Sequence, residues 1–279
     1  MPSSPSSASL ERPTLAGLAA ALRAGTTTSA ALTRAVLARI DDPAGQGRIA
    51  FLRVDRAGAQ TAAAASDRLR RDGCVPSPLA GIPVSVKDLF DIAGETTTAG
   101  ARVLSGAAPA RRDATAVARL RAAGAILVGR TNMTEFAFSG IGLNPHYGTP
   151  LAPFDRATGR IAGGSSSGAA VSVAEEMAHL ALGTDTGGSL RIPAAFCGLA
   201  AFKPTAARIP AEGAYPLSRT LDSVGPIAAT VACCAIADAV LAGEPPVTLA
   251  PRPPRGLRLC VADGRMLERL EPAVARAFE

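Results

Sequence analysis

Two glycine-rich segments that carry serines have the clearest potential for chemistry. The first is residues 163–168 (GGSSSG) and the second is residues 183–189 (GTDTGGS). Successive backbone N–H groups at a glycine turn can donate hydrogen bonds to the charge that develops on a carbonyl oxygen. A serine hydroxyl is a weak nucleophile at neutral pH and requires a base to take its proton. The segments therefore indicate acyl transfer by a serine, provided that a base lies nearby.

The candidate base is a lysine. The chain has two histidines, His146 and His179, and a lone histidine is more often structural than catalytic. Of the 29 basic residues only Lys87 and Lys203 are lysines. Burial can lower the pKa of a lysine by several units, whereas an arginine stays protonated. Lys87 follows an apolar stretch at residues 82–86, which favours burial, although a surface lysine at a strand end would leave the same pattern.

Three other interpretations of these residues are disfavoured. Residues 164–168 match the G-x-S-x-G nucleophile elbow with Ser166 at its centre, but that motif requires a preceding strand, and residues 154–160 are polar. That fold also needs a strand with an acidic residue between the serine and the histidine, and His179 follows Ser166 too closely to leave room for it. A phosphate-binding loop would need a lysine after the segment. No His, Cys, Asp or Glu cluster has metal-ligand spacing, so we expect no metal site.

Composition excludes several classes of protein. The chain has 279 residues, 48% of them hydrophobic, which is enough for a sizeable core. Its apolar runs fall short of the roughly 18 residues of a membrane span, and its first residues lack a secretory signal. Five cysteines without a C-x-x-C motif are typical of the cytoplasm. The net charge of +6 comes from scattered arginines, and aromatic residues are only 4%, so nucleic-acid binding is not expected.

Hydrophobic periodicity predicts alternating strands and helices, which is typical of an α/β protein with a largely covered sheet. A loop at 139–168 separates two such stretches, and a proline-rich linker follows at 243–254. We expect helices at residues 15–22, 30–40, 113–123, 169–178, 230–241 and 267–278, an alanine-rich helix ending before Gly73, a short helical piece after Ser189, and strands at 50–54, 82–86, 125–128, 179–183, 199–202 and 257–262.

The same residues resemble the amidase signature family. The resemblance is carried by residues 81–88 (GIPVSVKD), 163–170 (GGSSSGAA), 183–193 (GTDTGGSLRIP) and 197–205 (CGLAAFKPT), and it covers roughly residues 15–241. It implies an α/β fold with a mixed β-sheet core covered by helices. The expected organisation is a flexible leader at 1–14 followed by one amidase signature domain at 15–279. Family members are usually longer, so the resemblance also implies that the C-terminal part of the fold is missing.

The resemblance assigns roles by position. Ser189 would be the nucleophile, Ser165 a relay with a cis peptide bond to its neighbour, and Lys87 the base. Backbone N–H groups of Thr186, Gly187, Gly188 and Ser189 would hold the oxyanion, and Asp185 and Arg191 would brace the loop.

The activity implied is hydrolysis of a small-molecule amide through a seryl acyl-enzyme, without metal or cofactor. Nucleic acid and membrane are not expected as partners, and a homodimer is the oligomer common among relatives. Two alternatives stay open: the glutaminase subunit of a tRNA-dependent amidotransferase, and a truncated non-catalytic homologue. That glutaminase usually has an acidic residue at the place of Thr134 and a different stretch at 141–146, so a stand-alone amidase fits better.

Overall fold

The computed structural model describes residues 12–245, 255–258, 260–261, 264–265 and 267–279. The chain divides into two units, Met1–Thr248 and Leu249–Glu279. The predicted leader lies outside the described residues except for positions 12–14, and the predicted linker does so from position 246 onward.

A six-stranded mixed sheet forms the centre of the first unit, in the order β1-β3-β2-β4-β6-β5. The inner strand β2 pairs in parallel with both β3 and β4, whereas the β1–β3, β4–β6 and β5–β6 pairs are antiparallel. The carboxyl ends of β2, β3 and β4 therefore meet at one edge of the sheet. The strands are β1 (Phe51–Val54), β2 (Pro83–Lys87), β3 (Ile126–Thr131), β4 (Leu180–Asp185), β5 (Ala200–Ala201) and β6 (Ser223–Ala228).

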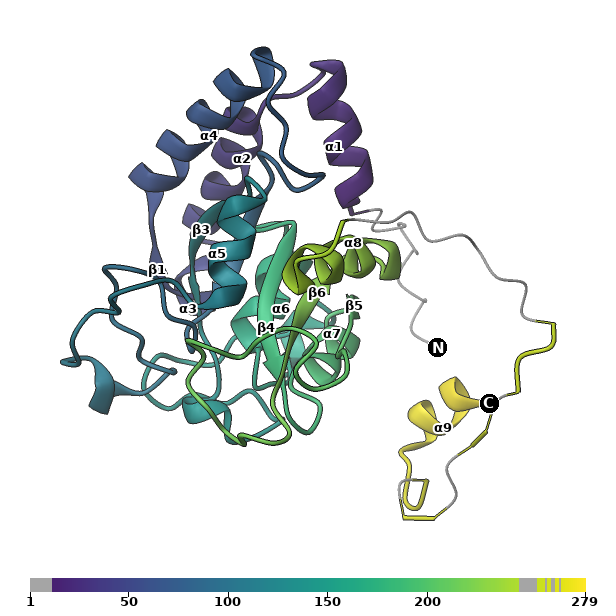
Figure 1. Ribbon diagram of the computed structural model, residues 1–279. Coiled ribbons are helices and arrows are strands. Elements are labelled where there is room, and N and C mark those ends of the chain that lie inside the picture. The colour runs from purple at the N-terminus through teal and green to yellow at the C-terminus, as the bar shows by residue number, and fades with distance from the viewer. Residues whose placement is uncertain (1–11, 246–254, 259, 262–263, 266) are drawn as a thin grey trace. The chain divides into compact units, whose positions relative to one another are not determined.

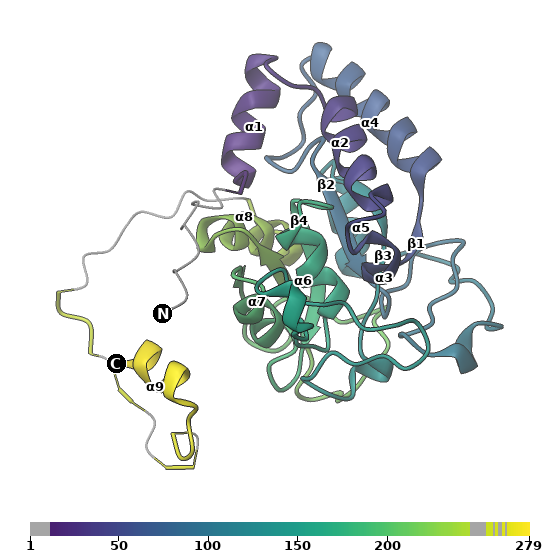
Figure 2. The same cartoon turned by 180° about the vertical axis from the view of Figure 1, so that it is seen from behind.

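Helices cover both faces of this sheet (Figures 1 and 2). One apolar cluster joins α1, α5 and α8 to the sheet, and a second joins α2, α4, α6 and α7 to it. The fold class expected from the sequence, a mixed sheet covered by helices, is confirmed. The helices are α1 (Leu15–Ala24), α2 (Ser29–Asp41), α3 (Gly47–Ala50), α4 (Arg56–Arg71), α5 (Thr115–Ala122), α6 (Ser167–Ala174), α7 (Arg191–Phe196) and α8 (Val231–Ala242), with 3-10 turns at η1 (Arg102–Leu104), η2 (Glu135–Ala137) and η3 (Arg156–Thr158).

Local signals set the ends of several helices. The hydroxyl of Thr14 accepts from Gly17 N–H at the start of α1, and Thr230 accepts from Cys233 N–H at the start of α8. Both helices end in a glycine with a left-handed backbone, Gly25 and Gly243. Such caps satisfy backbone groups that have no partner inside the helix. These two helices lie close to where the sequence predicts them.

Strand alternation places the functional side chains. Val84 and Val86 of β2 belong to the cluster with α1, α5 and α8. Ser85 points to the opposite face, where its hydroxyl lies 2.8 Å from that of Ser172 in α6. Since side chains alternate along a strand, Lys87 leaves β2 on the face of Ser85, toward α6. That face also meets the segment that precedes α6.

The structure differs from the sequence prediction in two strands. β6 was not expected, because Gly225 and Pro226 weaken its strand pattern, but pairing with β4 on one side and β5 on the other holds it in the sheet. The strand expected at 257–262 is not formed by residues 257, 258, 260 and 261, and residues 259 and 262 lie outside the described part. In the second unit, α9 (Pro272–Phe278) falls within the helix expected at 267–278.

Candidate active site

Lys87 ends β2 with its side chain fully buried. Its amine donates hydrogen bonds to two hydroxyls, Ser165 Oγ at 2.7 Å and Thr184 Oγ1 at 3.0 Å. Within the described part of the chain it forms no ion pair. Two neutral acceptors compensate an ammonium only weakly, so this environment favours the free amine.

The pKa of Lys87 reflects this environment. Burial lowers it from the ordinary value of 10.5 to about 7, opposed by the negative charges of Asp185 and Asp222, which raise it. A pKa near 7 leaves a large fraction of the amine unprotonated at neutral pH. The amine can therefore accept a proton from a hydroxyl in contact with it.

Ser165 lies at the point where the first glycine-rich segment passes the amine. Its side chain is completely buried, and the peptide bond between Gly164 and Ser165 is cis, as the resemblance implied. The segment is fixed on both sides, because Gly164 N–H donates to Gly140 O at 2.8 Å and Ser165 O accepts from Thr134 N–H at 3.0 Å. These hydrogen bonds keep the Ser165 hydroxyl within hydrogen-bond distance of the Lys87 amine.

Ser189 lies in the second glycine-rich segment, between β4 and α7, and is only 7% exposed. The two segments are in direct contact, since Ser166 N–H donates to Ser189 O at 3.3 Å. In the described residues the Ser189 hydroxyl has no hydrogen-bond partner. The structure therefore places Ser189 on a segment in contact with the one that carries Ser165, whose hydroxyl contacts Lys87 at the carboxyl edge of the sheet.

Asp185 and Arg191 brace the second segment. The Asp185 carboxylate accepts from the backbone N–H groups of Gly188 (2.7 Å) and Leu190 (3.1 Å), and Arg191 Nη2 lies 2.9 Å from its Oδ1. Burial is the largest single effect and raises the pKa of Asp185, but Arg191 and the two backbone donors together lower it further, so the pKa lies below its ordinary value. The bracing role that the resemblance assigned to this pair agrees with the geometry.

The oxyanion donors differ from expectation at one position. Gly188 N–H is already committed to Asp185, so it is not free to bind a carbonyl oxygen. The N–H groups of Thr186, Gly187 and Ser189 donate to no acceptor in the described part of the chain. These three remain candidates for the oxyanion hole, and Gly188 instead shapes the turn at a φ of 130°, where a side chain would meet Ile192.

Two residues that contact this site could not be identified from the sequence. Thr184 accepts from the Lys87 amine, and Asp222 accepts from the hydroxyl of Thr186. Thr184 lies in β4, 97 positions from Lys87, and only the parallel pairing of β2 with β4 brings the two together. Asp222 precedes β6, the strand that was not predicted. No local pattern could have identified either one.

The remaining candidates lie elsewhere. His146 is 3.0 Å from Glu135 in the loop that precedes the first glycine-rich segment. His179 is buried before β4, and burial lowers its pKa to about 4. Ser166 follows a coil rather than a strand and begins no nucleophile elbow. Among the described residues no cluster could hold a metal ion, and no described helix is long and apolar enough to span a membrane.

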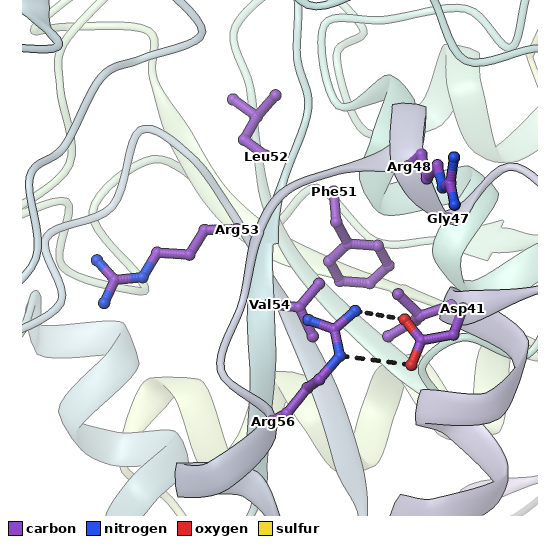
Figure 3. A pocket seen from close by; sticks show the side chains of 9 residues that line it. Asp41, Gly47, Arg48, Phe51, Leu52, Arg53, Val54 and Arg56 are labelled. Atoms are coloured by element: carbon purple, nitrogen blue, oxygen red, sulfur yellow. Dashed lines mark hydrogen bonds and ion pairs between the residues drawn. The ribbon is translucent and has the colours of Figure 1, made fainter.

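A separate hollow of about 430 Å³ lies beside β1, away from this cluster (Figure 3). Arg48, Arg53 and Arg56 line it, and Arg56 is paired with the Asp41 carboxylate. Its lining holds no serine or lysine. It therefore lacks the groups for acyl transfer.

Comparison with known proteins gives a consistent result. The family model described as Amidase matches residues 31–279. The chain is 42% identical to a component of the glutamyl-tRNA(Gln) amidotransferase of Chloroflexus aggregans, over 92% of this chain and 54% of the relative. It is also 42% identical to the AtzE component of 1-carboxybiuret hydrolase of a Pseudomonas species, over 81% of this chain and 51% of the relative.

Solved structures agree with these relatives. A crystal structure of an amidase matches with a TM-score of 0.77 and 42% identity, covering 84% of this chain and 52% of the other. The native peptide amidase of Stenotrophomonas maltophilia matches with a TM-score of 0.75 and 38% identity, covering 86% and 49%. The chain thus spans about half the length of the relatives it matches.

Proposed function

Since this chain belongs to the Amidase family, we propose that it hydrolyses a small carboxylic amide to the acid and ammonia or an amine, through a seryl acyl-enzyme. The observation that carries the proposal is the buried amine of Lys87, which lies 2.7 Å from Ser165 Oγ. An unprotonated amine in contact with a hydroxyl is the base that a serine nucleophile needs. The proposed catalytic residues are Lys87, Ser165 and Ser189.

The reaction follows from this geometry. Ser189 Oγ attacks the amide carbon while its proton passes to Ser165, whose own proton passes to Lys87. Negative charge on the former carbonyl oxygen is held by the N–H groups of Thr186, Gly187 and Ser189, which have no acceptor among the described residues. The C–N bond then breaks as the proton returns through Ser165 to the departing nitrogen. Water attacks the ester by the same relay and releases the acid, which restores Ser189.

The direct test is covalent labelling of the full chain with a fluorophosphonate, read by mass spectrometry. We expect label on Ser189 in the wild type and none in Ser189→Ala. Ser105→Ala, which removes an exposed hydroxyl elsewhere, should label like the wild type. Equal labelling of Ser189→Ala would refute the assignment, and a folded wild type that takes no label would favour a non-catalytic homologue.

A glutaminase role is a second candidate, because a 42% identical relative is part of a glutamyl-tRNA(Gln) amidotransferase. A screen of aliphatic and aromatic amides by ammonia release should therefore include glutamine. Hydrolysis of glutamine that rises when amidotransferase partner subunits are added would favour this candidate. Hydrolysis of other amides without a partner would favour the stand-alone amidase.

We also propose a cytoplasmic location and a homodimer. Cys74, Cys197, Cys233, Cys234 and Cys260 are unpaired, as is typical of a reducing compartment. Light scattering of the purified chain measures the oligomeric state directly, and a monomeric mass would contradict the homodimer.

A further inference from the structure

A hollow of about 380 Å³ opens beside Thr184, the second hydroxyl that accepts from the Lys87 amine. We call it the Tyr215 pocket. Its lining on the far side comes from the segment that precedes β6. The residues that define it are Thr184, Ala214, Tyr215, Ser218, Arg219 and Asp222. A molecule in this pocket therefore lies beside the threonine that contacts Lys87, the proposed base.

The two charged groups of the Tyr215 pocket, Asp222 and Arg219, differ in the partners that they have within the protein. The Asp222 carboxylate accepts from the hydroxyl of Thr186 and from the backbone N–H groups of Leu217 (2.9 Å) and Ser218 (3.0 Å). Arg219 forms neither an ion pair nor a hydrogen bond with any described residue. The carboxylate oxygens are occupied by neutral donors, whereas the guanidinium has no partner among the described residues.

We propose that the Tyr215 pocket binds a carboxylate of the substrate and that Arg219 recognises it. The amides hydrolysed would then carry a free carboxylate, as the monoamides of dicarboxylic acids do. This inference rests on the proposed function, since it adds a substrate class to the same site.

The chemistry of the lining supports an anion. A guanidinium presents paired N–H donors that match the two oxygens of a carboxylate. Tyr215 and Ser218 also line the pocket, and a hydroxyl can donate to the same group. Ala214 and the ring of Tyr215 offer apolar surface for a short carbon chain.

Succinamate and succinamide test the proposal, because they share a shape and differ in one charge. For the wild type we expect a lower KM for succinamate than for succinamide. Arg219→Gln should raise the KM for succinamate about tenfold with little change in kcat, and should leave succinamide unchanged. Arg219→Lys should restore part of the preference. Arg34→Gln, which removes an exposed charge on α2, should behave like the wild type.

A binding measurement separates this inference from the proposed function. Calorimetric titration of wild type and Arg219→Gln with succinamate requires no turnover. Binding that is lost in Arg219→Gln but kept in Arg34→Gln supports the carboxylate pocket even if no amide is hydrolysed. Equal binding by all three proteins, no binding of succinamate by the wild type, or an unchanged ratio of the two KM values in Arg219→Gln would overturn it.

Discussion

Two basic side chains are buried at the ends of neighbouring parallel strands, and they have different surroundings. Arg130 of β3 is 2% exposed, and its Nε donates to Asp88 Oδ1 at 2.7 Å. Its second guanidinium nitrogen donates to the carbonyls of Asp88 (2.9 Å) and Phe90 (2.8 Å). Lys87 of β2 is 0% exposed and has two hydroxyls instead.

The difference separates a structural charge from a reactive one. An arginine stays protonated in either setting, and with a carboxylate and carbonyl partners Arg130 can fix the fold around it. A buried lysine with only hydroxyl partners gives up its proton more easily and can act as a base. In β2 and β3 these two arrangements lie side by side, since Val86 pairs with Arg130 in the strand register.

The largest expected effect is the loss of activity in Lys87→Met. Removing the base should lower turnover and labelling of Ser189 by at least about 10³-fold. Lys203→Met, which alters the other lysine, serves as the control. Labelling of Lys87→Met at the wild-type rate would place the base elsewhere.

The same substitution should stabilise the fold, because the folded state holds an amine whose pKa is lowered. Below pH 7 the amine is protonated in both the folded and the unfolded chain, and burial of the ammonium costs up to about 5 kcal/mol. This penalty shrinks as the pH rises from 7 toward 10.5, because the unfolded chain then binds more protons. Urea unfolding at pH 6 and pH 10 should show that the free energy of unfolding of Lys87→Met exceeds that of the wild type, and that this excess is smaller at pH 10. A loss of stability at pH 6 would contradict the account.

Arg130→Met should destabilise the fold, in contrast to Lys87→Met. Among the described residues it leaves the buried Asp88 carboxylate with Thr98 and the Gly100 N–H as donors, and breaking a buried pair destabilises the fold by about 3–5 kcal/mol. Arg112→Met breaks an ion pair with Glu212 that is well exposed on both sides, so it should change stability by less than about 1 kcal/mol. Thermal unfolding of the two variants measures this contrast. Similar melting temperatures would mean that the Arg130 pair is not structural.

The smallest expected effect is a shift of the pH–rate profile in Asp222→Asn. The rate should fall as the pH drops through the pKa of Lys87, about 7, because the protonated amine cannot accept a proton. The charge of Asp222 raises that pKa, so its removal should move the acid limb to lower pH. Asparagine keeps an acceptor for the Thr186 hydroxyl. An acid limb that stays in place or moves upward would contradict this coupling.

The sequence predicts the elements of this site better than their contacts. Lys87 could be identified because its residue type is rare here and follows an apolar stretch, and Ser165 and Ser189 because they lie in glycine-rich segments. The Asp88–Arg130 pair and the Thr184 contact could not be predicted, because they depend on strand pairing between distant positions. The hydrogen bond from Gly188 N–H to Asp185 also could not be predicted, because it depends on the backbone path of one turn.

The same limit applies to the fold. Helices with a strong local signal, such as α1 and α8 with their threonine caps and C-terminal glycines, lie close to where periodicity places them. β6 has a weak local signal, and its strand state comes from two neighbours. The apolar stretch at 257–262 has a strand-like pattern, but its described residues form no strand, because a strand needs a partner as well as a pattern.

The most direct measurement of the central claim is the titration of the Lys87 amine itself. The chain has only two lysines, so labelling with [ε-¹³C]lysine yields two NMR signals, and Lys203→Arg assigns them. The signal of Lys87 should report loss of its proton near pH 7. A Lys87 signal that keeps the ammonium shift up to pH 10 would show that the buried amine is not the base.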